Sequence, residues 1–548
     1  MKELKDLPLW NEFEKKADPS HIAMVQKLVN HASNNLKLIR DTFPTYTLHD
    51  HTHSANVVRL MGELLGEKIH EITALEGAIL IMSAYYHDIG MVFKEAERNN
   101  LQNEEGFKPF LHKHPAAQIE IHKNDGELTS YVAEWYCRWC HPERVYLFLN
   151  EIDEDLKWGK TPLKDALGAV CESHGKDISE LLDEDRFNPD FLIGQADLRF
   201  CAILLRLADI LDFDNSRAPE EIYSYLDLKE RDNPIKKTSD VEWKKHLCSD
   251  GFIFPKGKSN EIGIIAAPEE PAVEHDLREF IKIIENEFMK CSNMLQRHVG
   301  RWHSLSLPER INTNNIKSKN YKYGEHRFSL DQEQVLELLM GENLYDNPFV
   351  FIRELLQNAI DTCRHRQFYE ESQGNIDYKP KIEIYDWRDA NYNHWVRIDD
   401  NGMGMNEEKI HNYLLKVGNS FYNSNQFEAE KLEYKTKEGN DFTPISRFGI
   451  GILSCFIAGD KVEVNTRHIL DDSALRLRLP GLHSFYTLQS KENRHKPFEF
   501  ESPTGKECDY RKESGTSLLV RLKYRNYFDE FFGDDFNGIL GLEINFFL

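Results

Sequence analysis

The chain has 548 residues, of which 40% are hydrophobic and 29% charged, enough apolar material for two large or three ordinary globular domains. Asp and Glu total 92 against 68 Lys and Arg, and the net charge of −24 argues against attraction of the whole molecule to nucleic acid or anionic membranes. Nine cysteines, no secretory leader and no apolar run of about 18 residues favour a cytoplasmic protein without a transmembrane helix.

The first 302 residues are predicted to form a mainly helical domain. Residues 250–266 alternate around a polar turn and predict a small β-hairpin inserted among the helices. Elsewhere apolar residues recur at spacings of three and four, as in helices with one buried face, over residues 21–39, 75–90, 129–140, 191–211 and 272–300.

A polar stretch poor in aliphatic side chains, residues 303–330, predicts a linker. Beyond it, two helical segments precede four strand patterns, which predicts an α+β two-layer sandwich over residues 331–548. Residues 419–444 are polar and form a long loop for the interior of a domain, so we expect a lid there.

The helical half contains residues that suit a metal centre. His53 leads into a helix, His87 and Asp88 end an apolar helix, and Asp209 lies within another. A divalent metal used in hydrolysis needs neutral imidazoles and carboxylates from several elements, with one position open for water. The alternatives are that the His-Asp pair faces water at a helix end and that Asp209 pairs with Arg206.

The order His…His-Asp…Asp resembles that of the HD superfamily of metal-dependent phosphohydrolases, over about residues 40–215. Near the start of this region, His53 fits the first position better than His49 or His51, because Ser54 and a Val-containing helix follow it. The resemblance implies one or two divalent metals, Mn, Fe, Ni or Mg, held by His53, His87, Asp88 and Asp209.

Many HD proteins bind a second metal through further histidines, and His141 and His174 lie where these are expected, with His114 a weaker candidate. Asp88, His141 and His174 are therefore also candidate catalytic residues. The chain departs from signalling members of the family after the His-Asp-Ile-Gly segment. Met91 replaces the lysine that these members place near the substrate phosphate, and Lys94 is the nearest lysine along the chain.

A structural zinc site is the alternative for this region. Its residues would follow a Cys-x2-Cys…Cys-x2-His pattern. Both pairs lie in predicted helices, whereas such zinc sites usually lie on turns. We favour the HD interpretation, in which the cysteines are small core residues. The four residues of the alternative are Cys137, Cys140, Cys171 and His174.

The C-terminal half contains four motifs of a nucleotide pocket. Glu354, Asn358 and Asp361 fall on one face of a predicted helix, which could alternatively be a stripe facing water. A strand ends at Asp400, and a later strand begins at Thr516. Glycines that allow close backbone approach, or that precede a helix N-terminus suited to phosphate, are Gly402, Gly404, Gly449 and Gly451.

These motifs in this order resemble the GHKL ATPases, which include gyrase, the heat-shock-90 chaperones, histidine kinases and MutL, and most of all the chaperone branch over residues 331–525. The resemblance implies ATP with Mg²⁺ as cofactor. Glu354 would be the general base, Asn358 would bind Mg²⁺, and Asp400 with Thr516 would hold adenine. The other nucleotide-binding candidates are Asp361, Gly402, Gly404, Met405, Gly449 and Gly451.

Together these resemblances imply a phosphohydrolase, acting on a nucleotide, cyclic nucleotide or nucleic-acid phosphoester, that an ATP-driven switch regulates. Such a pairing suits bacterial stress or antiphage defence by analogy only. The alternative is a chaperone-like ATPase whose HD domain is a non-catalytic ligand sensor or scaffold. The chain ends about 30 residues after Thr516, so we expect either slow ATP hydrolysis by the chain alone or a partner protein that supplies the γ-phosphate cation, and we expect a homodimer.

Overall fold

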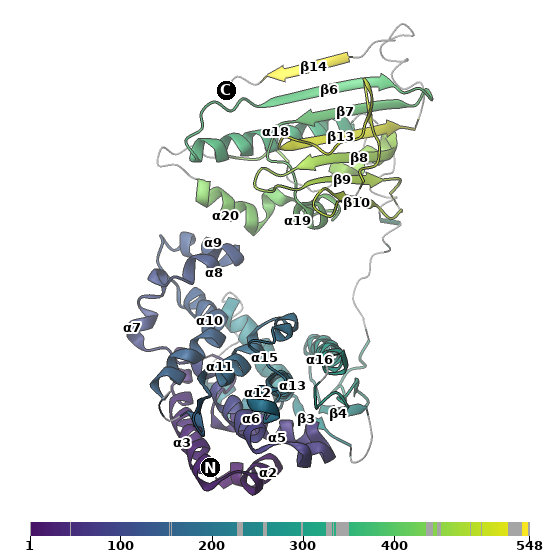
Figure 1. Cartoon of the computed structure of the whole chain (residues 1–548). Helices are drawn as coiled ribbons and strands as arrows, with labels where there is room; N and C mark the ends of the chain where they lie inside the picture. The colour runs from purple at the N-terminus through teal and green to yellow at the C-terminus, as the bar shows by residue number, and fades with distance from the viewer. Residues whose placement is uncertain are drawn as a thin grey trace. The chain divides into compact units, whose positions relative to one another are not determined.

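The computed structural model of the chain (Figure 1) describes residues 2–43, 45–152, 154, 156–226, 234–255, 260–297, 300–324, 331, 334–335, 350–434, 442–446, 451–482, 484–494, 496–523 and 540–545. It divides into two compact units. The first comprises Met1–Lys113 and Asn124–His326, and the second comprises His114–Lys123 and Arg327–Leu548.

The first unit is built around α6 (Ala74–Tyr86), an almost fully buried helix. Its N-terminus carries a capping box, in which Thr73 and Glu76 satisfy each other's backbone N–H groups. The helices packed against α6 are α2 (Pro8–Lys16), α3 (Pro19–Leu36), α5 (His51–Leu65), α11 (Lys164–Glu172) and α13 (Leu198–Leu211).

The longer helices α10 (Ser130–Glu151) and α16 (Pro271–Arg297) pack against α11 and α13 respectively. The remaining α-helices of the chain's first half are short or peripheral. They are α1 (Lys2–Lys5), α4 (Ile39–Thr42), α7 (Glu95–Arg98), α8 (Phe107–Lys113), α9 (Pro115–Lys123), α12 (Phe191–Gly194), α14 (Glu220–Leu226) and α15 (Pro234–Leu247).

The predicted hairpin is present as β3 (Ser249–Ile253) and β4 (Glu261–Ala266), which pair antiparallel. A third strand, β5 (Arg310–Asn312), pairs parallel with β4 and comes from the segment that we predicted as a linker. Leu305 and Leu307 of the same segment, and Trp302 just before it, are buried. The first part of the predicted linker therefore packs against the helical unit, because its few large apolar side chains are used in the core. A separate two-stranded pair is formed by β1 (Lys157–Trp158) and β2 (Thr161–Pro162).

The second unit contains an antiparallel sheet with the strand order β10-β9-β8-β13-β7-β6-β14. Two helices, α18 (Val350–Ser372) and α21 (Gly451–Ala458), pack against one face of it. The strands are β6 (Lys381–Arg388), β7 (His394–Asp400), β8 (Gly459–Arg467), β9 (Ala474–Leu479), β10 (Thr487–Ser490), β13 (Gly515–Leu522) and β14 (Leu540–Asn545), and a small hairpin is formed by β11 (Phe500–Ser502) and β12 (Gly505–Glu507).

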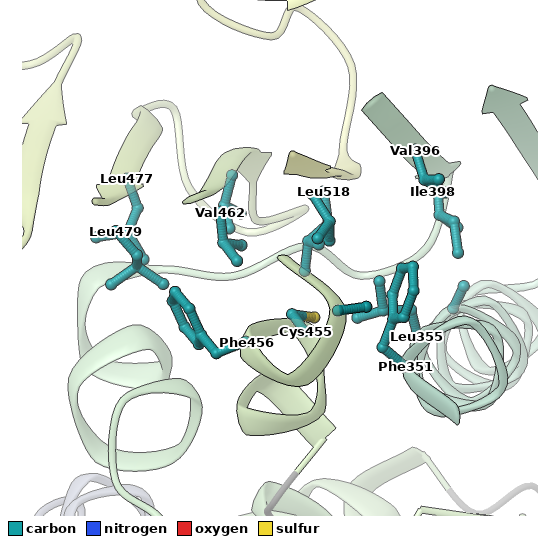
Figure 2. Packing of buried hydrophobic residues seen from close by; sticks show 14 of the residues in the cluster. Phe351, Leu355, Val396, Ile398, Cys455, Phe456, Val462, Leu477, Leu479 and Leu518 are labelled. Carbon is teal, nitrogen blue, oxygen red and sulfur yellow. The ribbon is translucent and has the colours of Figure 1, made fainter. Parts of the chain in front are cut away.

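The core of the second unit lies between this sheet and the two helices. Figure 2 shows Phe351 and Leu355 of α18 and Cys455 and Phe456 of α21 facing apolar side chains of the strands, among them Leu518. Every second residue of the strands, such as Val462 and Val464 of β8, supplies the other half of this layer. The arrangement confirms the predicted fold class, a mainly helical region followed by an α+β sandwich.

The segment predicted as a lid contains a helix as well as loops. The helix α20 (Asn425–Tyr434) follows the short elements α19 (Glu407–Lys409), η7 (Ile410–Leu414) and η8 (Phe421–Asn423). Phe427, Tyr434 and Phe442 pack with Phe368 of α18 in an aromatic cluster. Residues 435–441 of the predicted lid lie outside the described residues.

None of the helices in the described ranges combines the length and the apolar character needed to cross a membrane.

Candidate metal centre and nucleotide pocket

The predicted metal ligands of the first unit come together from five elements. His53 lies in the first turn of α5, whose N-cap residue Asp50 accepts a hydrogen bond from Thr52 N. His87 is the C-cap residue of α6, and Asp88 follows it. The remaining ligand candidates are Asp209 in the last turn of α13, His141 in α10 and His174 just after α11.

In the first pair of imidazoles, the rings of His53 and His87 face each other, with their Nε2 atoms 3.1 Å apart. The Nδ1–H group of His87 donates to the carbonyl oxygen of Ala84 (3.1 Å), and that of His53 donates to Asp212 Oδ2 (2.6 Å). Both neutral rings therefore present an Nε2 lone pair to the other. Two facing lone pairs repel unless a cation lies between them, so this geometry fits a metal ion.

The second pair, His141 and His174, repeats the arrangement with Nε2 atoms 2.9 Å apart. Their Nδ1–H groups donate to the carbonyl oxygens of Arg138 and Cys171, each at 2.6 Å. A carbonyl oxygen only accepts, so the tautomer of both rings is fixed with Nε2 unprotonated in the neutral form. Metal-bound histidines are held in this way by a partner on the other ring nitrogen.

Asp88 lies between the two imidazole pairs. Its Oδ2 atom is 3.3 Å from Nε2 of both His53 and His87, and its Oδ1 atom is 3.6 Å and 3.8 Å from Nε2 of His141 and His174. Asp209 Oδ1 is 3.4 Å from Nε2 of the first pair. The donor set fits two divalent ions that share the Asp88 carboxylate, one at His53, His87 and Asp209 and one at His141 and His174.

The charges of this centre favour a cation. Burial acts to raise the pKa of Asp88 and of Asp209, but the facing imidazoles, His87 foremost, hold both pKa values well below the usual range. In the metal-free chain a proton on His53 supplies the positive charge, since, against the effects of burial and of Arg217, hydrogen bonds to aspartates raise its pKa to about 9. A bound metal would take the place of that proton and leave the ring neutral. The carboxylates are therefore ionised at neutral pH, and the nearby imidazoles gain from positive charge.

A second layer of residues holds these ligands, and our ligand prediction did not include it. His49 Nδ1 lies 2.9 Å from Asp88 Oδ2. Arg217 is buried and donates to the carbonyl oxygens of Leu48 (3.1 Å) and Asp212 (3.4 Å). The sequence signals were the first histidine of His-Asp-His-Thr-His, which is His49, and Asp212 one turn beyond Asp209. Arg217 had no signal.

The structure also bears on the alternatives. Arg206 pairs with Glu287 (2.7 Å) and not with Asp209. The thiol of Cys171 donates to the carbonyl oxygen of Ser83, and no metal-ligand group within the described ranges includes a cysteine or His114. The zinc alternative is therefore without geometric support. Met91 is buried, at 3% exposure, and Lys94 is exposed.

The nucleotide pocket is a cavity of about 450 Å³ in the second unit, between α18, the strand ends and the lid segment. This volume suits a small-molecule ligand. The predicted residues that line it are Glu354, Asn358, Asp400, Gly404, Met405, Gly451 and Thr516. Gly449 lies outside the described residues.

At one end of this cavity, Asp400 is fixed by backbone groups. Its Oδ1 atom accepts hydrogen bonds from Gly402 N (2.9 Å) and Thr516 N (3.2 Å), which leaves Oδ2 for a ligand. Burial raises the pKa of Asp400 to about 6. The hydroxyl of Thr466, which our prediction did not include, lies 3.0 Å from that of Thr516 and accepts from Met405 N.

Two glycines permit the close approach of neighbouring chain segments. Gly404 has a φ of +70°, and a side chain there would collide with the carbonyl of Arg467. A side chain at Gly402 would collide with the backbone of Thr362 in α18. Gly402 therefore acts on the pocket through packing and through its N–H group, and does not line the cavity.

At the other end, Glu354 and Asn358 lie one turn apart on α18. A side chain at Gly451 would approach Asn358 Nδ2 to 3.0 Å, so the glycine keeps this end open. Arg353 Nη2 donates to Glu354 Oε1 at 3.1 Å. This end therefore offers an amide oxygen, a carboxylate and an exposed guanidinium to a charged ligand.

Asp361, which we predicted to bind the nucleotide, does not line the cavity. It is fully buried, and its carboxylate accepts the backbone N–H groups of Ile445 (2.9 and 3.0 Å) and Ser446 (2.7 Å). Because Ile445 and Ser446 do line the cavity, Asp361 acts on the pocket through them.

These two sites, on these two folds, define a chain with an HD-type domain and a GHKL-type ATPase domain. Comparison with protein-family models agrees. Residues 43–290 match the HD-CE family, and residues 347–508 match the histidine kinase-, DNA gyrase B- and HSP90-like ATPases. Both predicted resemblances are confirmed, and the two domains imply hydrolase activity.

Among curated proteins, the chain is similar to the chaperone protein HtpG. It is 30% identical over 218 residues to that of Chlorobium phaeobacteroides, 38% of this chain and 33% of the relative. For Campylobacter jejuni the values are 32% over 200 residues, 36% of this chain and 28% of the relative. The chain thus spans about a third of these relatives or less. Neither match bears on a role in stress or antiphage defence.

Proposed function

We propose that the chain is an ATP-regulated, metal-dependent phosphohydrolase, whose HD domain cleaves a nucleotide, cyclic-nucleotide or nucleic-acid phosphoester. The observation that carries this proposal is two imidazole pairs with facing Nε2 atoms, the buried His53 and His87 and the partly buried His141 and His174, joined by the Asp88 carboxylate. Such an arrangement of neutral rings is unfavourable as a structural core and favourable around divalent cations.

The residues of the HD domain would have distinct roles. His53, His87 and Asp209 would hold one metal, His141 and His174 a second, and Asp88 would be shared. When bound, the metals would supply Lewis acidity toward the phosphoryl oxygens and toward water. Asp212 would keep His53 in the ligating tautomer, and Arg217 would fix the segment that carries His49, since its Nε–H donates to the carbonyl oxygen of Leu48 (3.1 Å).

The residues of the GHKL domain would bind ATP with Mg²⁺. The Asp400 carboxylate would accept from the adenine amino group, and Thr516 would support it. Asn358 would hold Mg²⁺ between the phosphates. Glu354 would orient the attacking water and accept its proton, since it lies one helical turn from Asn358 in the same cavity. The lid segment would close over the nucleotide and thereby change the activity of the HD domain.

The proposal extends to the state of the protein in the cell. All nine cysteines are free, which suits the reducing cytoplasm. We propose a homodimer, and a partner protein that supplies the cation for the γ-phosphate. Arg353 is the exposed guanidinium already beside Glu354 and would compete for that task.

The test is a screen of phosphoester substrates with the Mn²⁺-loaded full chain, with and without ATP, together with metal analysis of the purified protein. Hydrolysis should be lost in the double variant His87→Ala plus Asp88→Ala and kept in Glu354→Ala. A change of rate on ATP addition would establish regulation. A chain that binds no more divalent metal than the double variant does would rule out the proposal.

A second candidate function is a chaperone-like ATPase whose HD domain is a non-catalytic sensor. It is favoured by Met91, buried where a phosphate-binding lysine would be expected, and by the similarity to HtpG. It predicts ATP hydrolysis and suppression of client aggregation, with no turnover of any phosphoester by the metal-loaded chain. The same screen therefore separates the two candidates.

A further inference from the structure

The lid segment contributes one tyrosine to the wall of the nucleotide cavity. Tyr422 lies in the short helix η8, and it lines the cavity together with Asp400 and Met405. None of the roles proposed above uses its side chain. A nucleotide that fills this cavity therefore meets a side chain of the lid as well as those of the sheet and of α18.

Three aromatic neighbours fix the ring of Tyr422. It packs edge to face against Phe427, with ring centroids 4.9 Å apart, and against Phe442, at 5.9 Å. The imidazole of His365 in α18 lies 6.0 Å from it, at an angle of 70°. Edge-to-face contacts at such distances are a favourable arrangement of aromatic rings. The direction of the hydroxyl is therefore largely set before a ligand binds, which lowers the entropic cost of a hydrogen bond to it.

The hydroxyl of Tyr422 is available to a ligand. Among the residues that the structure describes it has no hydrogen-bond partner, and it is not one of their enclosed polar atoms. The hydroxyl of Thr516, which also lines the cavity, is by contrast paired with that of Thr466. Tyrosine hydroxyls in partly buried positions usually have a partner, so a group of the ligand completes this one.

The hydroxyl also keeps its proton. Burial raises the pKa of Tyr422 well above its ordinary value, and the carboxyls of Asp361 and Asp400 act in the same direction. At neutral pH the hydroxyl is therefore a donor. Because the influence of a charge falls with distance, the effect of Asp400 indicates that the hydroxyl faces the end of the cavity where the Oδ2 atom of Asp400 is left for a ligand.

A donor and an acceptor at the same end of the cavity match one edge of adenine. The exocyclic amino group donates, and the ring nitrogens on either side of it, N1 and N7, accept. Asp400 Oδ2 would accept from the amino group, and Tyr422 would donate to one of these nitrogens. A 6-oxopurine presents an oxygen acceptor to the Asp400 carboxylate instead and is repelled.

We propose that the Tyr422 hydroxyl donates a hydrogen bond to N1 or N7 of a bound adenine, so that the lid segment recognises the base held by Asp400. The inference rests on the proposed contact between Asp400 and the adenine amino group. It adds a specificity-determining residue to the pocket, and it makes the base, as well as the phosphates, a ligand of the lid. The lid therefore distinguishes a pocket that holds adenine from one that does not.

The experiment measures binding of adenosine to the full chain by calorimetry, because adenosine lacks the phosphates that the metal centre could bind. Tyr422→Phe removes only the hydroxyl and should weaken binding about three- to tenfold, the value of one hydrogen bond between neutral groups. Tyr434→Phe is the matched control, since Tyr434 belongs to the same aromatic cluster but does not line the cavity. It should bind adenosine within about twofold of the unaltered chain.

Deaza analogues identify the atom that Tyr422 contacts. In the unaltered chain either 1-deazaadenosine or 7-deazaadenosine should bind about three- to tenfold more weakly than adenosine, because each lacks one acceptor. In Tyr422→Phe that same analogue and adenosine should bind within about twofold of each other, since the hydroxyl that distinguished them is gone. For 3-deazaadenosine the ratio to adenosine should be the same in both chains. The comparison in the unaltered chain does not depend on the folding of a variant.

Hydrogen exchange measures the effect on the lid. Saturating adenosine should slow the exchange of the amides of α20 in the unaltered chain, since Phe427 of that helix packs on Tyr422, and should slow it less in Tyr422→Phe. Equal slowing in the two chains would contradict the recognition of the base by the lid.

Two results of the binding experiment would overturn the role of Tyr422. One is an affinity for adenosine that Tyr422→Phe keeps, and the other is a loss by the same factor for adenosine and all three analogues, which marks a packing role. Dependence on N3 alone would overturn the assignment to N1 or N7. Asp400→Asn separates this inference from the proposed function. Adenosine binding that Asp400→Asn leaves unchanged would contradict the proposed adenine contact, whereas binding that Asp400→Asn weakens and Tyr422→Phe does not would contradict only the role of Tyr422.

Discussion

Asp212 offers a sharp test of the metal centre, because it is no proposed metal ligand and its shortest contact is with His53, while Arg217 Nε is 3.8 Å from the same oxygen. It is buried, at 2% exposure, and its Oδ2 atom accepts from His53 Nδ1–H at 2.6 Å. Asp212→Asn keeps the volume and a hydrogen-bond acceptor but removes the negative charge that makes His53 a strong ligand. Changes of this kind to a partner of a ligating histidine cost about 10–100-fold in metal affinity.

At about 1.4 kcal/mol per factor of ten, this loss corresponds to about 1.4–2.8 kcal/mol. The geometry narrows this range of free energies, because the hydrogen bond between His53 and Asp212 is short and buried and its acceptor is an ionised carboxylate. His53 lowers the pKa of the Asp212 carboxyl against the effect of burial. We therefore expect the upper half of the range for the metal held by His53 and His87. The metal held by His141 and His174 should lose less, because Asp212 does not contact these two side chains.

The assay is competition for Mn²⁺ with a chromogenic chelator, which resolves two dissociation constants if two metals bind. Asp185→Asn, at an exposed position, is the matched control and should bind as the unaltered chain does. Far-ultraviolet circular dichroism establishes that both variants are folded. A folded Asp212→Asn chain with both dissociation constants within about twofold of the control would refute the assignment of His53 as a ligand.

Three further predictions concern the nucleotide pocket. Adenosine, which has no phosphate to titrate, should bind best when the Asp400 carboxyl is ionised. Its affinity should therefore fall by up to about tenfold per pH unit below pH 6, and this fall should be absent in Asp400→Asn. Glu354→Ala should keep ATP binding and lose most hydrolysis, about 100-fold or more, measured by phosphate release; unchanged hydrolysis would mean that another group orients the water. Asp361→Asn should weaken the hold on Ile445 and Ser446 and raise hydrogen exchange at these two amides, with ATP affinity reduced about tenfold; unchanged exchange there would contradict the anchoring role.

Much of the fold was predictable from the sequence, because periodicity and residue type report on local structure. The apolar run of α6 and the alternation in β3 and β4 are local signals, and each matched the element found. The helix α20 was missed because its buried face is aromatic and discontinuous in sequence: Phe427 and Tyr434 pack on Phe368, about 60 residues earlier. The strand β5 was missed because a strand of three residues is too short to show an alternation of apolar and polar residues.

The residues of the candidate sites were predictable where the chemistry of the side chain itself indicates the role. Histidines and aspartates in the order of a known family point to metal, so His53, His87 and Asp209 could be selected. Asp361 could not be placed, because its role depends on which backbone amides the fold brings to it. No sequence pattern indicated the role of Arg217, since a single arginine after a helix occurs in many structural contexts.

Each of the two sites contains a buried carboxylate, and the groups around that carboxylate shift its pKa in opposite directions in the two sites. One oxygen of Asp400 is fixed by backbone amides, no cation offsets burial fully, and its pKa rises to about 6. Asp88 is flanked by imidazoles on both oxygens, which hold its pKa well below the usual range. Mild acid should therefore protonate Asp400 while Asp88 stays ionised. If ATP regulates the HD domain, acidification to pH 5.5 should remove regulation through loss of nucleotide before it removes the carboxylate charge of the metal centre.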